Sequence, residues 1–135
     1  MKTWQSIALA TLAALASASA LAGKPETTAS GLIYESLKDG SGAQPTAESR
    51  VEVHYRGTLT DGKEFDSSYK RGQTATFPLN RVIPCWTEGV AKMKEGGKAK
   101  LTCPPGIAYG ARGAGAAVPP NATLNFEVEL VKVMR

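Results

Sequence analysis

The chain has 135 residues, of which 42% are hydrophobic, and a formal net charge of +4 at pH 7. This length suits one globular domain and is too short for two. The lysines and arginines are scattered along the chain and form no clustered stripe. This distribution disfavours nucleic-acid binding and indicates a solvated basic surface.

The first residues have the pattern of a secretory signal peptide. Lys2 precedes an alanine-rich apolar run over residues 7–15, and the small residues that follow offer cleavage sites near residues 20–22. The run is shorter than the roughly 20 residues of a membrane-spanning helix. We therefore predict a signal peptide over residues 1–22 and an exported protein, periplasmic or secreted, without a membrane span. A retained anchor helix is the alternative.

The mature chain is expected to begin with a short segment that lacks regular structure. Residues 23–30 are small and polar, which predicts a mobile lead-in to a domain over residues 31–135. Apolar residues over 32–37 then predict a first strand, and residues 39–42 have the composition of a turn.

The next segments predict strands joined by a tight turn. Strict alternation over residues 51–56 predicts a half-buried strand. Asp61-Gly62 predicts a turn, after which residues 65–68 bring an aromatic ring, a carboxylate and two hydroxyls together. Alternate apolar residues over 75–79 share another strand face.

Helical spacing replaces alternation between Val82 and Met93, where apolar residues, Trp86 among them, recur on one face. Pro84 suits a first helical turn, and Gly96-Gly97, following two lysines, predicts the end of the helix. We therefore predict one short amphipathic helix.

Two further strands are separated by a long connection. Residues 98–103 alternate again, and residues 124–130 form the clearest strand pattern in the chain. The intervening residues 104–121 are rich in proline, glycine and alanine. Loops of this length are uncommon inside a compact domain and are usually functional, although a floppy surface excursion is the alternative. The sequence thus predicts four or five strands and one helix.

Two cysteines, Cys85 and Cys103, lie in the predicted mature chain. An even number of cysteines in an exported protein favours a disulfide. Cys103 shares the inward parity of Leu101, and closing this loop would contribute about 3 kcal/mol of stability. Two buried free thiols are the alternative. A redox-active pair is disfavoured because the close Cys-x-x-Cys spacing is absent.

The residue pattern favours an apolar pocket over metal, nucleotide or covalent chemistry. His54 is the single histidine, no second ligand lies at metal-like spacing, and no serine motif surrounds it. No phosphate-binding glycine loop opens a helix, so we expect neither a metal nor a cofactor. Aromatic and branched apolar residues beside a few polar groups instead predict a small-molecule or peptide site. The residues that would line it are Tyr55, Phe65, Asp66, Phe77, Val82, Ile83, Trp86, Tyr109, Val118 and Phe126.

Several motifs, in a consistent order from about Gly31 to the C-terminus, are similar to those of one known family. They are Val53-His54-Tyr55-x-Gly57, Asp61-Gly62, Phe65-Asp66-Ser67-Ser68, Val82-Ile83-Pro84-x-Trp86, Ala108-Tyr109-Gly110 and Pro119-Pro120-Asn121-Ala122-Thr123-Leu124. Through these motifs the chain resembles the FK506-binding-protein (FKBP) type of peptidyl-prolyl cis/trans isomerase.

This resemblance implies an α+β fold in which a twisted antiparallel sheet of about five strands wraps around one short helix. It also implies a pocket with Trp86 at its floor and Asp66 paired with Arg71. Position 85, usually glycine in the family, carries cysteine here. The residues implied in catalysis are Tyr55, Phe65, Asp66, Trp86, Tyr109 and Phe126, and those implied in substrate binding are Phe77, Val82, Ile83, Val118 and Arg71.

The function that the resemblance implies is rotation of X-Pro amides in exported proteins as they fold, by non-covalent stabilisation of a twisted amide. Proline-containing polypeptides are the implied substrates, and FK506- or rapamycin-like macrolides are candidate ligands. A monomer is expected, because the chain carries no dimerisation helices of the kind some exported relatives have. A proline-peptide-binding chaperone module with little turnover is the alternative. A redox protein would rest only on the two cysteines.

Overall fold

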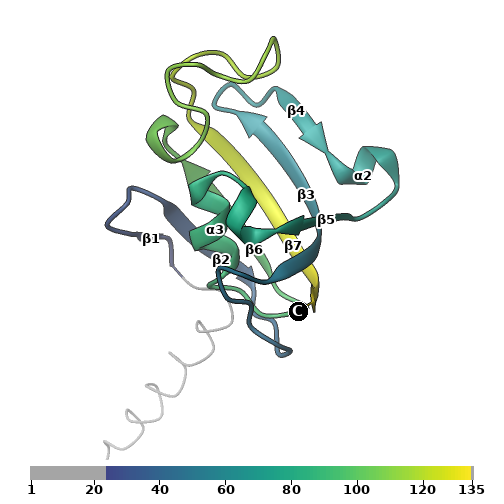
Figure 1. Ribbon diagram of the computed structural model, residues 1–135. Helices are drawn as coiled ribbons and strands as arrows, with labels where there is room; N and C mark the ends of the chain where they lie inside the picture. The colour runs from purple at the N-terminus through teal and green to yellow at the C-terminus, as the bar shows by residue number, and fades with distance from the viewer. Residues whose placement is uncertain (1–23, 135) are drawn as a thin grey trace, which may run out of the picture.

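The fold consists of one twisted antiparallel sheet that wraps around a short helix, which confirms the predicted α+β architecture (Figure 1). The computed structural model describes residues 24–134, and the predicted signal peptide lies outside them. The elements in chain order are β1 (Glu26–Thr27), β2 (Ile33–Lys38), β3 (Arg50–Leu59), β4 (Glu64–Ser67), α2 (Ser68–Arg71), β5 (Ala75–Pro78), the 3-10 helix η2 (Leu79–Arg81), α3 (Pro84–Val90), β6 (Lys98–Cys103), the 3-10 helix η3 (Pro105–Ile107) and β7 (Leu124–Met134). In the sheet the strand order is β1-β2-β6-β7-β3-β4, and β5 pairs with β3.

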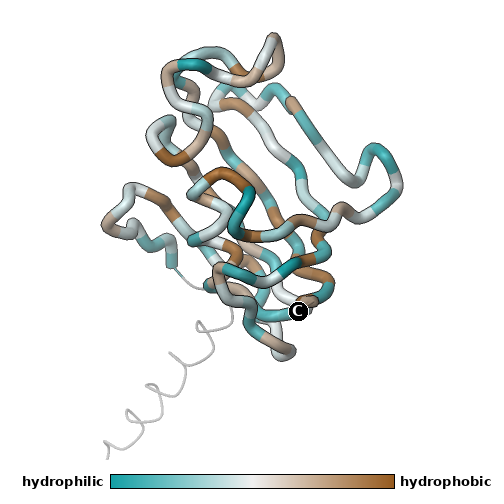
Figure 2. The backbone as a smooth tube through the Cα atoms, viewed as in Figure 1, coloured by the Kyte–Doolittle hydropathy of each residue, from teal (hydrophilic) through white to brown (hydrophobic). Residues whose placement is uncertain are grey.

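The two longest strands, β3 and β7, lie side by side in the middle of the sheet. Their register runs from Arg50 opposite Met134 to Leu59 opposite Leu124. Alternate residues along both strands are buried, as the alternation of apolar residues predicts. In Figure 2, brown apolar segments recur on α3 and along the strands behind it, whereas α2 is hydrophilic. The core therefore lies between α3 and the inner face of the sheet.

α3 packs on the sheet through one face, where Cys85, Trp86, Gly89 and Val90 are buried. Gly89 sets how closely the helix approaches β6, because a Cβ at this position would lie only 2.8 Å from the side chain of Leu101. The helical spacing of the apolar residues is thus explained by contact with a single surface.

The helix is shorter than predicted. It begins at Pro84, as expected, but ends at Val90 rather than near Gly96-Gly97. The backbone N–H of Met93 donates to the carbonyl of Val90 at 3.0 Å, so the chain tightens into turns after the helix while Met93 stays buried. None of the helices within residues 24–134 is long and apolar enough to cross a membrane.

Two short elements differ from the sequence-based expectation. In the expected lead-in, Glu26 pairs with Tyr34 as part of β1. The second element is α2, a single turn that follows β4. The Ser67 hydroxyl accepts a hydrogen bond from the backbone N–H of Lys70, and Gly72, with a φ of 69°, ends the turn. One turn is too short to show helical periodicity in the sequence.

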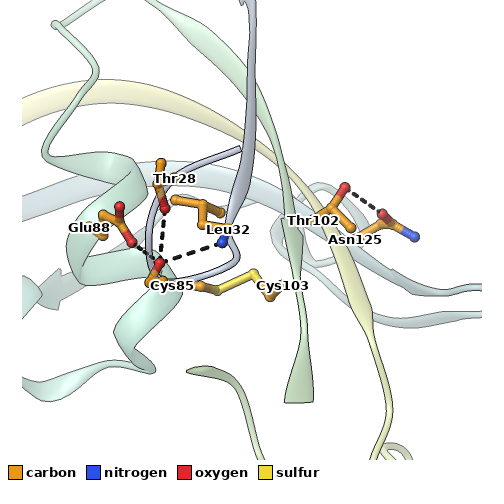
Figure 3. Close-up of a disulfide and its surroundings, with 8 residues drawn as sticks. Thr28, Leu32, Cys85, Glu88, Thr102, Cys103 and Asn125 are labelled. Atoms are coloured by element: carbon orange, nitrogen blue, oxygen red, sulfur yellow. Dashed lines mark hydrogen bonds between the residues drawn. A yellow bond between two sulfur atoms is a disulfide. The ribbon is translucent and has the colours of Figure 1, made fainter. Parts of the chain in front are cut away.

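Cys85 and Cys103 form the predicted disulfide, with their Cα atoms 5.8 Å apart. Both residues are fully buried. The bond connects the first turn of α3 to the last residue of β6, and Leu32 lies beside it (Figure 3). Trp86 therefore follows directly after a covalent attachment to the sheet.

Candidate functional site

A cavity of about 440 Å³ lies where α3 faces the β3, β4 and β7 strands. Most of its lining is aromatic or aliphatic, with three residues that carry a hydroxyl or carboxylate and one arginine. The lining residues are Tyr55, Phe65, Asp66, Phe77, Arg81, Val82, Ile83, Trp86, Tyr109 and Phe126. Sites for small molecules and peptides commonly combine an apolar wall with a few polar groups in this way.

Trp86 is the centre of the aromatic wall. Its ring makes edge-to-face contacts with Tyr55, Phe77 and Phe126 at centroid distances of 5.2, 5.5 and 5.4 Å. Only 4% of the residue is exposed. Its indole Nε1 is buried and has no hydrogen-bond partner within residues 24–134. These three contacts hold the indole rigidly at the floor of the cavity.

Glycine in the middle of β3 permits a second aromatic pair. Gly57 lies opposite Phe126 on β7 and opposite Asp66 on β4. A Cβ at Gly57 would lie 2.6 Å from the Phe65 ring and 2.9 Å from the Phe126 ring. Without it, the two rings meet edge to face at 5.6 Å. The close approach of these rings to the β3 backbone therefore requires glycine.

One edge of the cavity carries a closed polar network. The Tyr55 hydroxyl donates to Asp66 Oδ2 at 2.6 Å, and Arg71 Nη1 donates to Asp66 Oδ1 at 2.8 Å. Arg71 Nη2 also donates to the Tyr55 hydroxyl at 3.1 Å, and the Ser67 backbone N–H donates to Asp66 Oδ1 at 2.9 Å. Both carboxylate oxygens of Asp66 are thus occupied, and the Asp66–Arg71 pairing is observed.

The network fixes the charge of the carboxylate. Burial alone would raise the pKa of Asp66, but hydrogen bonds from Tyr55 and Arg71 outweigh it, and the pKa lies below its usual value. Burial, followed by the hydrogen bond to Asp66, raises the pKa of Tyr55. At neutral pH the site therefore holds an ionised Asp66 and a neutral Tyr55 hydroxyl.

The structure brings most of the sequence-predicted residues to this one cavity. Two are placed differently. Val118 is 3% exposed and belongs to the hydrophobic core without lining the cavity. Arg71 also lies outside the lining and reaches it through its bonds to Asp66 and Tyr55. Tyr109, on the loop before β7, is 41% exposed and stands at the cavity edge.

Sequence reasoning missed Arg81, which lines the cavity from the end of η2. The only available signal was its position immediately before Val82 and Ile83. A single arginine between Leu79-Asn80 and Val82-Ile83 carries no periodic pattern that would mark it as part of an apolar site. Its placement depends on how η2 turns into α3.

His54 is engaged on the outer side of β3. Its Nδ1 lies 2.9 Å from the Ser68 hydroxyl, and its ring stacks on Tyr69 at 4.6 Å. Residues 24–134 contain no group of three or more histidine, cysteine, aspartate or glutamate side chains arranged to hold a metal ion.

Comparison with known sequences identifies relatives of this domain. The family model for FKBP-type peptidyl-prolyl cis-trans isomerase matches residues 41–131. The isomerase FkpA of Aeromonas hydrophila is 56% identical over 108 residues, which are 80% of this chain but 40% of FkpA. FK506-binding protein 1 of Dictyostelium discoideum is 58% identical over 97 residues, covering 70% of this chain and 91% of that protein. The chain thus spans less than half the length of the FkpA relative.

Solved structures share the same fold. FkpA from Escherichia coli has a TM-score of 0.80 at 44% identity, with coverage of 93% of this chain and 59% of that one. A peptidyl-prolyl cis-trans isomerase from Pseudomonas syringae has a TM-score of 0.78 at 36% identity. The match covers 100% of this chain and 99% of that one. On these matches, the chain belongs to the FKBP-type peptidyl-prolyl cis-trans isomerase family.

Proposed function

We propose that this protein is a peptidyl-prolyl cis-trans isomerase that acts on exported polypeptides. The observation that carries the proposal is the aromatic cavity whose floor is Trp86 and whose polar edge is the Tyr55–Asp66–Arg71 network. Family membership supports the same reaction.

The reaction requires stabilisation of a twisted amide. No covalent bond is made or broken. Resonance in the C–N bond sets a rotation barrier of about 18–20 kcal/mol. In the twisted state the nitrogen has lost conjugation, and the amide has less charge separation than in the planar form. An apolar cavity favours that less polar state over the planar one, which is differential binding of the transition state. Each 1.36 kcal/mol removed from the barrier gives about a tenfold increase in rate.

The aromatic wall is proposed to hold the proline ring. Trp86 would lie beneath the ring, with Phe77 and Phe126 beside it, because their edge-to-face packing leaves a rigid apolar surface toward the cavity. A rigid floor keeps the proline fixed while the preceding residue rotates.

Two donors near the cavity edge are proposed to position the substrate carbonyls. The backbone N–H of Ile83 donates to no backbone carbonyl within the described chain, and Ile83 lines the cavity. The Tyr109 hydroxyl lies on a partly exposed side chain at the same cavity. Either donor fixes a carbonyl without entering the chemistry of rotation.

Asp66 is proposed to tune polarity beside the rotating amide. Its lowered pKa keeps it ionised, and Arg71 and Tyr55 satisfy its oxygens, so it does not act as a proton donor. Its role is electrostatic and architectural, since it also orients the ring of Tyr55.

Compartment and partners follow as part of the same proposal. The buried disulfide suits an oxidising compartment, which supports export and cleavage near residues 20–22. We propose that the domain acts as a monomer, and that the cavity also takes FK506- or rapamycin-like macrolides. N-terminal sequencing of the secreted protein tests the cleavage site. Sedimentation tests the monomeric state, and a macrolide titration tests ligand binding.

The central experiment is a protease-coupled isomerisation assay on short X-Pro peptides, with and without FK506. The wild-type protein is expected to accelerate rotation, and Trp86→Leu, which keeps an apolar side chain, is expected to lower kcat/KM by about tenfold or more. Tyr69→Leu is the matched control, because Tyr69 lies outside the cavity and is 42% exposed.

Two results would overturn the proposal. No acceleration over buffer by folded wild-type protein would remove the isomerase activity, and peptide binding without acceleration would favour the chaperone module. Equal rates for wild type and Trp86→Leu, with both proteins folded by near-ultraviolet circular dichroism, would show that the cavity is not the site.

A further inference from the structure

Arg81 brings a positive charge to a cavity that is otherwise largely apolar. It is the last residue of η2 and directly precedes Val82 and Ile83, which line the same cavity. Its side chain is exposed and forms no salt bridge with another residue in the described part of the chain. The guanidinium is therefore free to meet a ligand.

The other charge in the lining is already compensated. Asp66 is the only acidic residue among the lining residues, and it is paired with Arg71 at 2.8 Å and hydrogen-bonded by Tyr55. Since Arg71 supplies the countercharge for Asp66, the charge of Arg81 remains unbalanced at the cavity. A peptide that enters the site meets a net positive rim.

The backbone that carries Arg81 is anchored. The Leu79 N–H donates to the Ser49 carbonyl at 2.9 Å, and the Thr87 hydroxyl donates to the Leu79 carbonyl at 2.6 Å. Leu79 itself is fully buried. The backbone of η2, which ends at Arg81, is thus held in place. Only the Arg81 side chain must therefore be ordered when a ligand binds.

We propose that Arg81 is a specificity-determining residue that favours substrates with an aspartate or glutamate next to the proline. The inference rests on the proposed isomerase function and adds a substrate class to it. A planar guanidinium matches the two oxygens of a carboxylate, and the contact is specific to charge rather than to side-chain size. The preference is modest, since the pair forms at an exposed rim.

The test uses four peptide pairs. Two pairs differ only in the residue before the proline, glutamate against glutamine and lysine against glutamine, and the other two carry the same exchanges in the residue after the proline. At low salt, wild-type kcat/KM is expected to be about two- to fivefold higher for glutamate than for glutamine on one side of the proline. The ratio is expected to fall toward one at about 1 M salt, where exposed charges are screened.

Variants assign the effect to one side chain. Arg81→Gln is expected to remove the difference in kcat/KM between the glutamate and glutamine peptides, and Arg81→Glu is expected to favour the lysine peptide. Arg112→Gln is the matched control, because Arg112 is exposed and lies outside the lining, and it is expected to keep the preference.

The outcomes separate this inference from the proposed function. The role of Arg81 is overturned if wild type has equal kcat/KM for the glutamate and glutamine peptides, or if Arg81→Gln keeps the wild-type preference for glutamate. In either case the isomerase activity stands. If no peptide is accelerated, the isomerase function fails, and the dissociation constants of the same peptides, measured by calorimetry, still decide whether Arg81 selects carboxylates.

Discussion

At the residue scale, Gly57 and Asp66 show how single positions shape the cavity. Gly57 leaves room for Phe65 and Phe126 to cross the β3 backbone, and Asp66 holds Tyr55 in place at the polar edge. Neither role can be predicted from hydropathy. Gly57 acts because it has no side chain, and Asp66 acts through its charge. Each role leads to a separate test.

Gly57→Ala is expected to destabilise the protein by about 1–3 kcal/mol and to lower isomerase kcat/KM, because the new Cβ forces both aromatic rings to move. Chemical denaturation and the peptide assay measure the two effects. Gly106→Ala is the control, since a Cβ there meets nothing within 4 Å. Equal unfolding free energies for the two variants would contradict the steric argument.

Asp66→Asn tests the electrostatics of the polar edge. The folded-state pKa of Asp66 lies below 3.8, so its ionised form contributes stability at higher pH, and this contribution is lost as pH falls through the lowered pKa. The difference in unfolding free energy between wild type and Asp66→Asn is therefore expected to be constant near neutral pH and to shrink below about pH 4. A difference that persists unchanged at about pH 2 would show that charge is not its source.

At the element scale, α3 depends on its attachments. A helix of seven residues is marginal alone, so packing and cross-links must hold it. The disulfide attaches its first turn to β6 (Figure 3). The Thr87 hydroxyl donates to the Leu79 carbonyl, and the Ser30 hydroxyl in the lead-in donates to Glu88. Their members on α3, which are Cys85, Thr87 and Glu88, lie next to Trp86 in the helix, so these contacts help to hold the cavity floor in place.

Removing the disulfide with Cys85→Ala and Cys103→Ala together is expected to cost about 3 kcal/mol, the loop-closure contribution of this separation. Thermal and denaturant unfolding measure the loss. A reductant added to unfolded wild type is expected to produce a similar loss and to leave the double variant unchanged. If the double variant matches oxidised wild type, the disulfide does not stabilise α3.

At the scale of the whole molecule, stability is expected to concentrate in the centre of the sheet. β7 is hydrogen-bonded on both sides, to β3 and to β6, and β3 pairs with β4 and β5 as well. Residues 104–123 form a loop with only η3 and an isolated bridge between Ala114 and Val118. Opening this loop breaks far fewer contacts than opening the sheet.

Native-state hydrogen exchange tests this distribution. Amides of β7 between Phe126 and Leu130 are expected to exchange only through global unfolding, while those of residues 108–117 exchange through local opening. Added denaturant should accelerate the first group much more than the second. Equal exchange rates for the two groups would contradict a rigid sheet beside an easily opened loop.

Much of the fold and of the site was predictable from local pattern. Alternation marked β3, β6 and β7, and helical spacing marked α3 with Trp86 on its buried face. Cys103 had inward parity, in keeping with its disulfide. The end of α3 and the turn α2 were not predictable, because hydrogen bonds of the following turn and one cap decide them.

The sequence by itself therefore determined the element types, the inward faces and the aromatic set that resembles a known family. Inward-facing positions repeat every two residues in a strand and every 3.6 residues in a helix, so they can be predicted from the local sequence alone. Tertiary structure alone decided that Arg81 joins the cavity while Val118 enters the core. Those placements depend on contacts between residues distant in the chain, such as Leu79 with Ser49, and such contacts leave no local period.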